Sequence, residues 1–482
     1  MTFSLRTLKA VSIAVMVLIS PLTVSTSVQA ESLLEIYNKA VISDPSIREA
    51  QANMYATMEA KPQARADLLP QLDFSGQWQT RKTDGKNVIP IAGTPRNVLQ
   101  ETDEDSLNWS FDLTQTLFRW DQFARMGRAD QEVSQAQLDY GAAQQDLMVR
   151  VSESYFNVLA ARDTLASEQA AKEAIERQLE QANRRYEVGL IAITDVQEAQ
   201  AGFDEAIAAE IVAKRSLANA REALREITGD YNEVLAKPAK EIPLIIPEPA
   251  IQEEWVQIAQ EQNLALLSAK IGADITRYDI KASRSGYMPT VDLRASYGNN
   301  SADGNNTQDI LNTVTNSTTE RDIDSQSVGI QFSLPLFSGG GTTSEVKQAV
   351  YRHRASKENF EKVVRQTERE ARDAYYGVES EISRVKALRQ SRKSSEVALE
   401  ATEAGYEVGT RTTVDVLDAR RALFLAQTNY ARSRYDYIVN VIKLKQAAGT
   451  LNPDDLEMVN SWLQRESEVL DVNPALSDNN VE

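Results

Sequence analysis

The sequence contains no cysteine and only one histidine in 482 residues. Without cysteine the chain forms no disulfide and lacks the residue that a bacterial lipid anchor modifies, so an exported form must rely on packing or assembly for stability. His353 lies in a charged helical stretch, which favours a solvated side chain over a metal ligand or a catalytic base. Phosphate-binding and nucleophile motifs are also missing from the sequence. We therefore expect no metal, no cofactor and no enzymatic activity.

Long apolar runs are almost as scarce. One uncharged apolar stretch, residues 10–24, follows Arg6 and Lys9 and leads into Val28-Gln29-Ala30. This pattern predicts a cleaved secretory signal peptide, and no other segment approaches the roughly 20 apolar residues of a transmembrane helix. The formal net charge is −18. An exported chain this acidic is a poor candidate for binding nucleic acid or an anionic lipid surface.

The chain is internally duplicated. Tyr-Glu-Val-Gly starts at Tyr186 and again at Tyr406, 220 residues later, and a Pro-containing hexapeptide at Leu69 has a counterpart at Met288, 219 residues later. Matches in a common register indicate a repeat, and each half reads as helix, strand, strand, long helix, tip and long helix. The predicted division is a signal peptide at 1–30, a first repeat at 31–235, a linker at 236–250, a second repeat at 251–452 and an acidic, disordered tail at 453–482.

Two very long helices dominate this organisation, one from about Asp121 to Tyr186 and one from about Thr343 to Tyr406. At about 1.5 Å per residue each spans roughly 100 Å. Their narrow, coiled-coil-like apolar stripes cannot form a single-chain core, so the helices need neighbours. Each long helix ends at Val-Gly and a new helix starts a few residues later, which predicts a helical hairpin tip in each half. A shorter helix is predicted from Asp44-Pro45 to about Asp67.

Alternating apolar and polar residues predict two strands in each half. The apolar positions of these strands are Leu72, Phe74 and Trp78, then Leu107, Trp109, Phe111 and Leu113, then Val291, Leu293 and Tyr297, and finally Val328, Ile330, Phe332 and Leu334. The segments between the strands, 82–104 and 299–324, are rich in Asn, Asp and Gly and are predicted to be exposed loops. Four strands are too few for a transmembrane barrel, and open edges are not tolerated in lipid. If the strands cross a membrane, several chains must combine them.

Together with Ser-Leu-Pro-Leu-Phe-Ser-Gly-Gly at 333–340 and the two tip segments, these features resemble the TolC family of outer-membrane efflux ducts. The tips resemble the TolC type of member rather than its lipoprotein relatives. The resemblance implies a mainly α fold with β structure. In that fold a homotrimer combines four strands per chain into a membrane β-barrel, which continues as a long periplasmic α-helical barrel.

The same resemblance implies a passive exit duct for tripartite efflux and type I secretion, located in the outer membrane of a Gram-negative bacterium and extending into the periplasm. Its expected cargo is drugs, other small molecules or polypeptides. Its expected partners are outer-membrane lipid, a periplasmic adaptor and an inner-membrane pump of the RND, ABC or MFS type.

Specific residues receive roles from the resemblance. Asp415 and Asp418, spaced i, i+3 on one helix face, would form acid rings at the periplasmic aperture. Capping of the restarting helix remains an open alternative for Asp415, because Thr412 and Asp415 fit a capping box. The residues that would lock the closed gate are Thr194, Asp195, Tyr406, Arg411, Gln178 and Glu403. The residues that would receive the adaptor at the tips are Gly189, Leu190, Gly409 and Thr410.

Two other classes of protein remain as alternatives at this point. A periplasmic coiled-coil structural or adaptor protein without a pore explains the helices but leaves four symmetrically placed amphipathic strands unexplained. A secreted enzyme would need a convergent acid/base or metal set, and the sequence has none.

Overall fold

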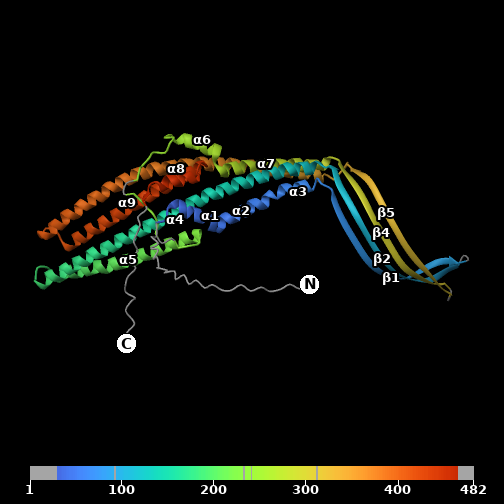
Figure 1. Cartoon of the computed structure of the whole chain (residues 1–482), viewed down its shortest axis with the longest axis horizontal. Coiled ribbons are helices and arrows are strands. Elements are labelled where there is room, and N and C mark those ends of the chain that lie inside the picture. Colours follow the sequence, from blue (N-terminus) through green and yellow to red (C-terminus); the bar gives the residue numbers. More distant parts are fainter. Residues whose placement is uncertain (1–29, 92–93, 232–233, 240–241, 311–312, 465–482) are drawn as a thin grey trace, which may run out of the picture.

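The computed structural model describes residues 30–464 except 92–93, 232–233, 240–241 and 311–312. The predicted signal peptide therefore lies, apart from Ala30, outside the described residues. The molecule is elongated, with a helical part at one end and a curved sheet at the other (Figure 1). None of the described helices carries an apolar stretch long enough to cross a membrane.

The helices occur in the predicted order. In the first half they are α1 (Leu33–Ser43), α2 (Pro45–Met58), α3 (Ala60–Ala66), α4 (Trp120–Glu187) and α5 (Ile193–Thr228). In the second half they are α6 (Gln252–Gln262), α7 (Leu264–Arg284), the short 3-10 helix η1 (Ser285–Tyr287), α8 (Gly341–Glu407) and α9 (Thr413–Ala448). The two predicted long helices are confirmed as α4 and α8. The helix predicted to start at Asp44-Pro45 is also confirmed, because the Asp44 carboxylate accepts a hydrogen bond from the Ser46 N–H at 2.7 Å. It is interrupted at Glu59, between α2 and α3.

The large sheet has four antiparallel strands in the order β1-β2-β4-β5. They are β1 (Gln71–Ile91), β2 (Thr94–Phe118), β4 (Thr290–Ile310) and β5 (Thr313–Ser333). The prediction of loops at 82–104 and 299–324 is wrong, because these segments continue the strands as long hairpins. Cross-strand polar contacts, such as Asn299 Nδ2 to Asp322 Oδ1 at 2.6 Å, support pairing despite the turn-like composition.

The register across the sheet separates apolar from polar residues. One row of directly opposed residues, one from each strand, is apolar: Leu72, Leu113, Ala295 and Val328. The adjacent row is polar: Asp73, Asp112, Ser296 and Ser327. Successive residues of a strand point to opposite faces, so the sheet has one apolar and one polar face near the helices. The predicted alternation is confirmed.

The main apolar core lies midway along the helical part, where α4 and α9 meet. Phe156 of α4 stacks on Tyr435 of α9 with ring centroids 5.8 Å apart. Leu159 and Ile438 beside them are fully buried. Val378 of α8 is buried in the same core, so the prediction that the long helices cannot form a core within one chain is wrong at the centre of the molecule.

The predicted disordered tail is wrong for residues 453–464. Asn452 caps helix α10 (Pro453–Asn460), and Leu456 and Val459 of that helix are fully buried in the main core. Strand β6 (Leu463–Gln464) then pairs with β3 (Lys237–Pro238) in the linker. The buried apolar pair fixes this segment in spite of its acidic composition. Residues 465–482 lie outside the described residues.

Where the sheet meets the helices, an ion pair connects the two halves. Arg119, between β2 and α4, donates from Nε and Nη2 to the two carboxylate oxygens of Asp292 at 3.1 and 2.6 Å. The Asp292 side chain, at the start of β4, is only 4% exposed. A bidentate, charge-assisted pair of this kind holds the two strands at a defined angle to α4.

Candidate functional site

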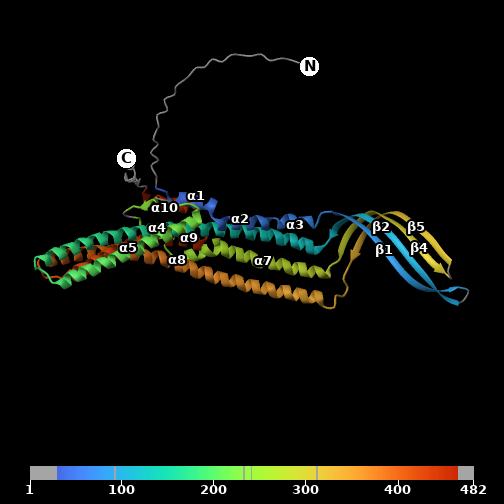
Figure 2. The same cartoon turned by 90° about the horizontal axis from the view of Figure 1, so that it is seen from below.

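The two hairpin tips lie together at the end of the molecule opposite the sheet (Figures 1 and 2). At the first tip, the Leu190 N–H donates to the Arg185 carbonyl oxygen at 2.9 Å. At the second tip, the Thr410 N–H donates to the Gly405 carbonyl oxygen at 2.9 Å. These bonds close both long helices with the same Schellman-type turn. Both predicted reversals are confirmed.

Each turn depends on a glycine with a positive φ angle. Gly189 has φ +74° and Gly409 has φ +79°, a region that other residues rarely adopt. A Cβ atom at either position would have no neighbour within 4 Å, so the glycines are needed for conformation and not for packing inside this chain. Leu190 is 72% exposed, and Val188 and Val408 are exposed as well. The tips thus present small and apolar groups to the outside.

Asp415 caps the helix that restarts after the second tip. Its carboxylate accepts hydrogen bonds from the Thr412 N–H at 2.9 Å and from the Thr412 hydroxyl at 3.0 Å. In return, the Asp415 N–H donates to Thr412 Oγ1 at 3.2 Å. These bonds, led by the backbone N–H of Thr412 and helped by nearby Arg411, lower the pKa of Asp415 below its ordinary value of 3.8. The acid is therefore held ionised at the start of α9.

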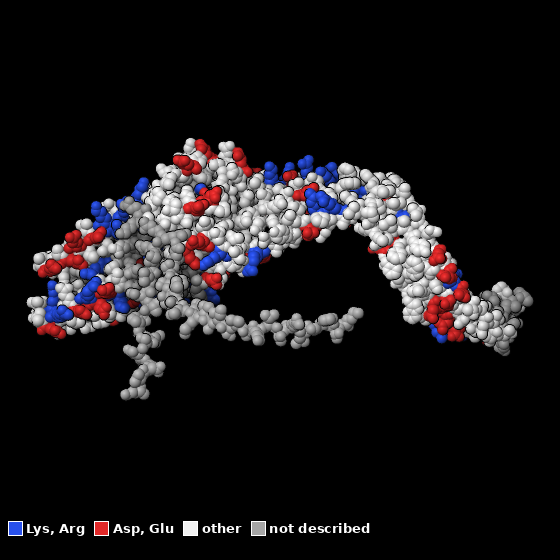
Figure 3. All heavy atoms as spheres, in the orientation of Figure 1, with Lys and Arg blue, Asp and Glu red and all other residues white. Residues whose placement is uncertain are grey.

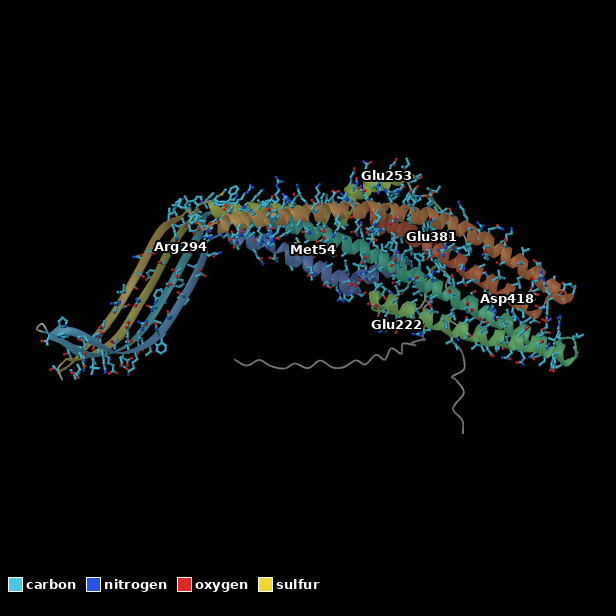
Figure 4. The ribbon with its side chains drawn as sticks, turned by 180° about the vertical axis from the view of Figure 1, so that it is seen from behind. Met54, Glu222, Glu253, Arg294, Glu381 and Asp418 are labelled. Atoms are coloured by element: carbon cyan, nitrogen blue, oxygen red, sulfur yellow. The ribbon has the colours of Figure 1, made fainter. Side chains whose placement is uncertain are left out.

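Asp418 lies one turn further along α9 and takes no part in the cap. Figure 4 shows it close to the tips, at the end of the molecule opposite Arg294 in the sheet. Its side chain is 65% exposed, and its Oδ1 lies 3.5 Å from Nη1 of Arg421. The two acids share a face of α9 but differ in their partners.

The residues predicted to lock the gate do not form one network within a single chain. The Asp195 carboxylate accepts a hydrogen bond from the Ala192 N–H at 3.2 Å, and among the described residues it makes no ion pair with Arg411. Tyr406 is buried, with the Arg185 guanidinium 4.7 Å above its ring and the Thr413 hydroxyl 3.4 Å from its own oxygen. Thr194 is exposed.

The predicted link between Gln178 and Glu403 is likewise absent from the described part of one chain. Glu403 accepts instead from Nη2 of Arg420 at 2.6 Å. Gln178 is only 5% exposed, and its side-chain nitrogen has no hydrogen-bond partner among the described residues. A buried amide without a partner is costly. A group supplied from outside this chain would satisfy it.

Three charged residues near the tips were missed by the sequence reasoning. Arg420 and Arg421 follow the acid pair after Ala419, and Glu205 of α5 contacts Arg421. The i, i+3 spacing of Asp418 and Arg421 could have indicated an ion pair along α9. The contact with Glu205 joins residues 216 positions apart, and no local pattern indicates it. Among the residues that the structure describes, no cluster is arranged to hold a metal ion.

Comparisons with known proteins place this geometry in context. The family model described as outer membrane efflux protein matches residues 36–230 and 255–450. The outer membrane protein TolC of Vibrio cholerae is 38% identical over 445 residues, which cover 92% of this chain and 96% of that protein. The alkaline protease secretion protein AprF of Pseudomonas aeruginosa is 30% identical, with 89% and 87% of the two chains covered.

Solved structures share the fold. The CmeC outer membrane channel of Campylobacter jejuni superimposes with a TM-score of 0.71 at 17% identity, covering 92% of this chain and 90% of that chain. CusC matches with a TM-score of 0.69 at 19% identity, covering 87% of this chain and 92% of that chain. Both are similar in fold to the elongated helical body and sheet described above.

Proposed function

Because this chain belongs to the outer membrane efflux protein family, it is an outer-membrane exit duct, and we propose that three copies complete the duct and receive cargo through a periplasmic adaptor. The observation that carries the trimer is the open sheet. It ends in two unpaired edges, at β1 and at β5. A membrane does not tolerate such edges, because lipid offers no hydrogen-bond partners to the free backbone groups.

Pairing β5 of one chain with β1 of the next removes every edge. Three chains of four strands give a barrel of twelve, an even number within the range of outer-membrane barrels. Two or four chains would also give an even number, and the likeness to the TolC family favours three. In this arrangement the apolar row that contains Leu113 faces lipid and the polar row that contains Asp112 lines water. The match to the outer membrane efflux protein family is what rejects the poreless periplasmic coiled coil.

The trimer can be tested with cysteines, since the chain has none of its own. Asp112 of β2 lies opposite Ser296 of β4. Applying the repeat spacing of 219 to that pair places Gln331 of β5 opposite Gln77 of a neighbouring β1. We expect the double variant Gln77→Cys/Gln331→Cys to form a covalent closed trimer on mild oxidation, because opposed residues lie within disulfide reach.

The readout of this experiment is the ladder of crosslinked species in denaturing gels without reductant. Each single-cysteine variant is the matched control and should stay monomeric after denaturation. A ladder that stops at three supports the trimer. Termination at two or at four chains, or no crosslink at all in outer-membrane fractions, would contradict it.

The tips are the proposed docking site for the adaptor. Gly189 and Gly409 leave open space around the backbone, and Leu190 with its exposed apolar neighbours offers a contact surface that this chain does not cover. Thr410 lies beside Gly409 in the second turn. A bulky residue at both glycines should abolish export while trimers still form, measured as drug susceptibility beside the crosslinking assay. Intact export in that variant would rule out docking at the tips.

The energy source and cargo lie outside this chain. CmeC is named as an outer membrane channel and AprF as a secretion protein, and neither name includes a pump or an energy source. We propose that an inner-membrane pump of the RND, ABC or MFS type drives transport and that the duct itself is passive. The name of AprF, a protease secretion protein, supports polypeptides as one class of cargo.

A further inference from the structure

Two arginines, Arg420 and Arg421, follow the acid pair of the second tip on α9, and their side chains contact different helices. Nη2 of Arg420 contacts Glu403 at 2.6 Å, on α8 of the same hairpin. Arg421 instead contacts Glu205, on α5 of the other hairpin. Arg421 thus connects the two hairpins close to their tips.

Arg421 is shared between two acids. Its Nη1 lies 3.5 Å from Oδ1 of Asp418, while its Nη2 donates to Glu205. The Arg421 side chain is 45% exposed, so its charge acts on the neighbouring water as well as on its partners. The triad Asp418–Arg421–Glu205 carries two negative charges and one positive charge. Of the two acids Asp415 and Asp418, only Asp418 lies within salt-bridge distance of Arg421 among the described residues.

We propose that Arg421 is a selectivity-determining residue of the periplasmic aperture, which lowers the negative charge presented to cations and holds α5 against α9. This inference rests on the proposed function, because it requires the tips to surround the narrow end of a duct. It extends that function, since an aperture lined by Asp415 and Asp418 alone would carry only negative charge. Arg421 makes the aperture less attractive to cations than Asp415 and Asp418 alone would.

The effect of the charge and the effect of the contact can be measured separately, because Arg421 and Glu205 carry opposite charges. Arg421→Ala removes a positive charge and Glu205→Gln removes a negative one, yet both break the same link between the hairpins. Loss of the link should raise single-channel conductance in both variants. Block by a trivalent cation should change in opposite directions, which a merely structural contact would not cause.

The experiment uses the full-length protein in planar bilayers, with hexaamminecobalt(III) added on the side of the tips. We expect the block to tighten roughly five- to tenfold in Arg421→Ala and to weaken by a similar factor in Glu205→Gln, since a unit charge about 10 Å from a trivalent ion changes the energy of that ion by roughly 1 kcal/mol in water. Arg421→Lys keeps the charge and should retain wild-type block. Arg365→Ala is the matched control, because Arg365 pairs with Glu361 on its own helix at 3.2 Å and forms no salt bridge to another helix among the described residues.

The outcomes distinguish this inference from the proposed function. Equal block in wild type, Arg421→Ala and Glu205→Gln, or a shift in the same direction in both variants, would overturn the role of Arg421. If Arg421→Ala fails to insert, Glu205→Gln alone decides, by weaker block together with higher conductance. If Asp415→Asn and Asp418→Asn leave the block unchanged, the assignment of the tips as the aperture fails, whatever Arg421 does.

Discussion

The two halves of the chain use equivalent aromatic residues in opposite ways. Phe156 of α4 and Tyr376 of α8 lie 220 residues apart, at the same position of the repeat. Phe156 is 2% exposed and stacks on Tyr435, whereas Tyr376 is 52% exposed. The helix α4 packs against α5 of its own half and α7 and α9 of the other, while α8 packs mainly against α6, α7 and α9 of its own half.

This difference shows where an apolar stripe is covered within one chain and where it stays exposed. The first long helix obtains its neighbours within the chain, so its apolar stripe becomes core. The second long helix keeps part of its stripe exposed, at one side of the helical layer (Figure 2). A duplicated sequence therefore builds a wall segment with one covered helix and one that a neighbouring chain can cover.

The largest expected effect follows from this contrast. Phe156→Ala should destabilise each subunit by about 3–5 kcal/mol, because it opens a cavity in the main core. Tyr376→Ala should leave the subunit folded and weaken its association with neighbours. Thermal unfolding in detergent and the temperature at which the assembled form dissociates in gels measure the two effects separately. Similar losses of subunit stability in both variants would break the comparison.

The ion pair at the junction offers a second contrast. Asp292 is bound by Arg119, whereas its repeat equivalent Asp73 is exposed and Ser338 occupies the position equivalent to Arg119. Asp292→Asn should lower the free energy of unfolding by about 1.5–3 kcal/mol, because charge-assisted hydrogen bonds to Arg119 are lost. Asp73→Asn should change stability by less than about 0.5 kcal/mol. Denaturant unfolding of the two variants side by side tests this, and equal costs would contradict it.

The smallest effect concerns the two caps. Thr412 and its repeat equivalent Ala192 have similar extended backbones, but only Thr412 has a hydroxyl that can cap. Thr412→Ala should lower the free energy of unfolding by about 0.5–2 kcal/mol. Ala192→Thr should raise it by part of that amount, because the added hydroxyl can cap the helix that starts after the first tip.

The same substitution also alters the response to pH. The lowered pKa of Asp415 means that its stabilising contribution is present above its unfolded value of 3.8 and is lost as the pH falls through the lower folded value. Thr412→Ala should raise the folded pKa, so that cation selectivity declines at a higher pH than in wild type. Reversal potentials measured in a salt gradient over a pH series provide the test. An unchanged midpoint would show that Thr412 does not hold Asp415 ionised.

Local patterns predicted much of this architecture. The Val-Gly breaks located both tips, and period-two alternation located the apolar rows of the sheet. The hairpins over 82–104 and 299–324 were missed, because strand pairing there depends on a partner strand and not on the composition of the segment. Helix α10 was missed for a related reason, since Leu456 and Val459 acquire their stabilising role from a core built by distant residues.

In the candidate site, too, local contacts could be predicted from the sequence and contacts between distant residues could not. Capping of α9 by Asp415 was readable from the Thr412 spacing, because both residues lie within one turn. The contact between Glu205 and Arg421 depends on how two hairpins lie beside each other. Among the described residues the Gln178 side-chain nitrogen has no hydrogen-bond partner, so the fold of one chain does not test its predicted gate contact.

The length of the strands has a consequence for the cell surface. Strands of 21 to 25 residues are about twice as long as the roughly 9–11 residues that cross a bilayer. The apolar rows lie in the half nearest the helices, and Asp103 and Asp105 lie beyond them along β2. Figure 3 shows acidic side chains gathered on the part of the sheet that is remote from the helices. The outer half of each hairpin therefore extends beyond the length that a bilayer requires, and it carries these acids. It is the first part of the duct that an antibody or a phage approaching from outside would meet.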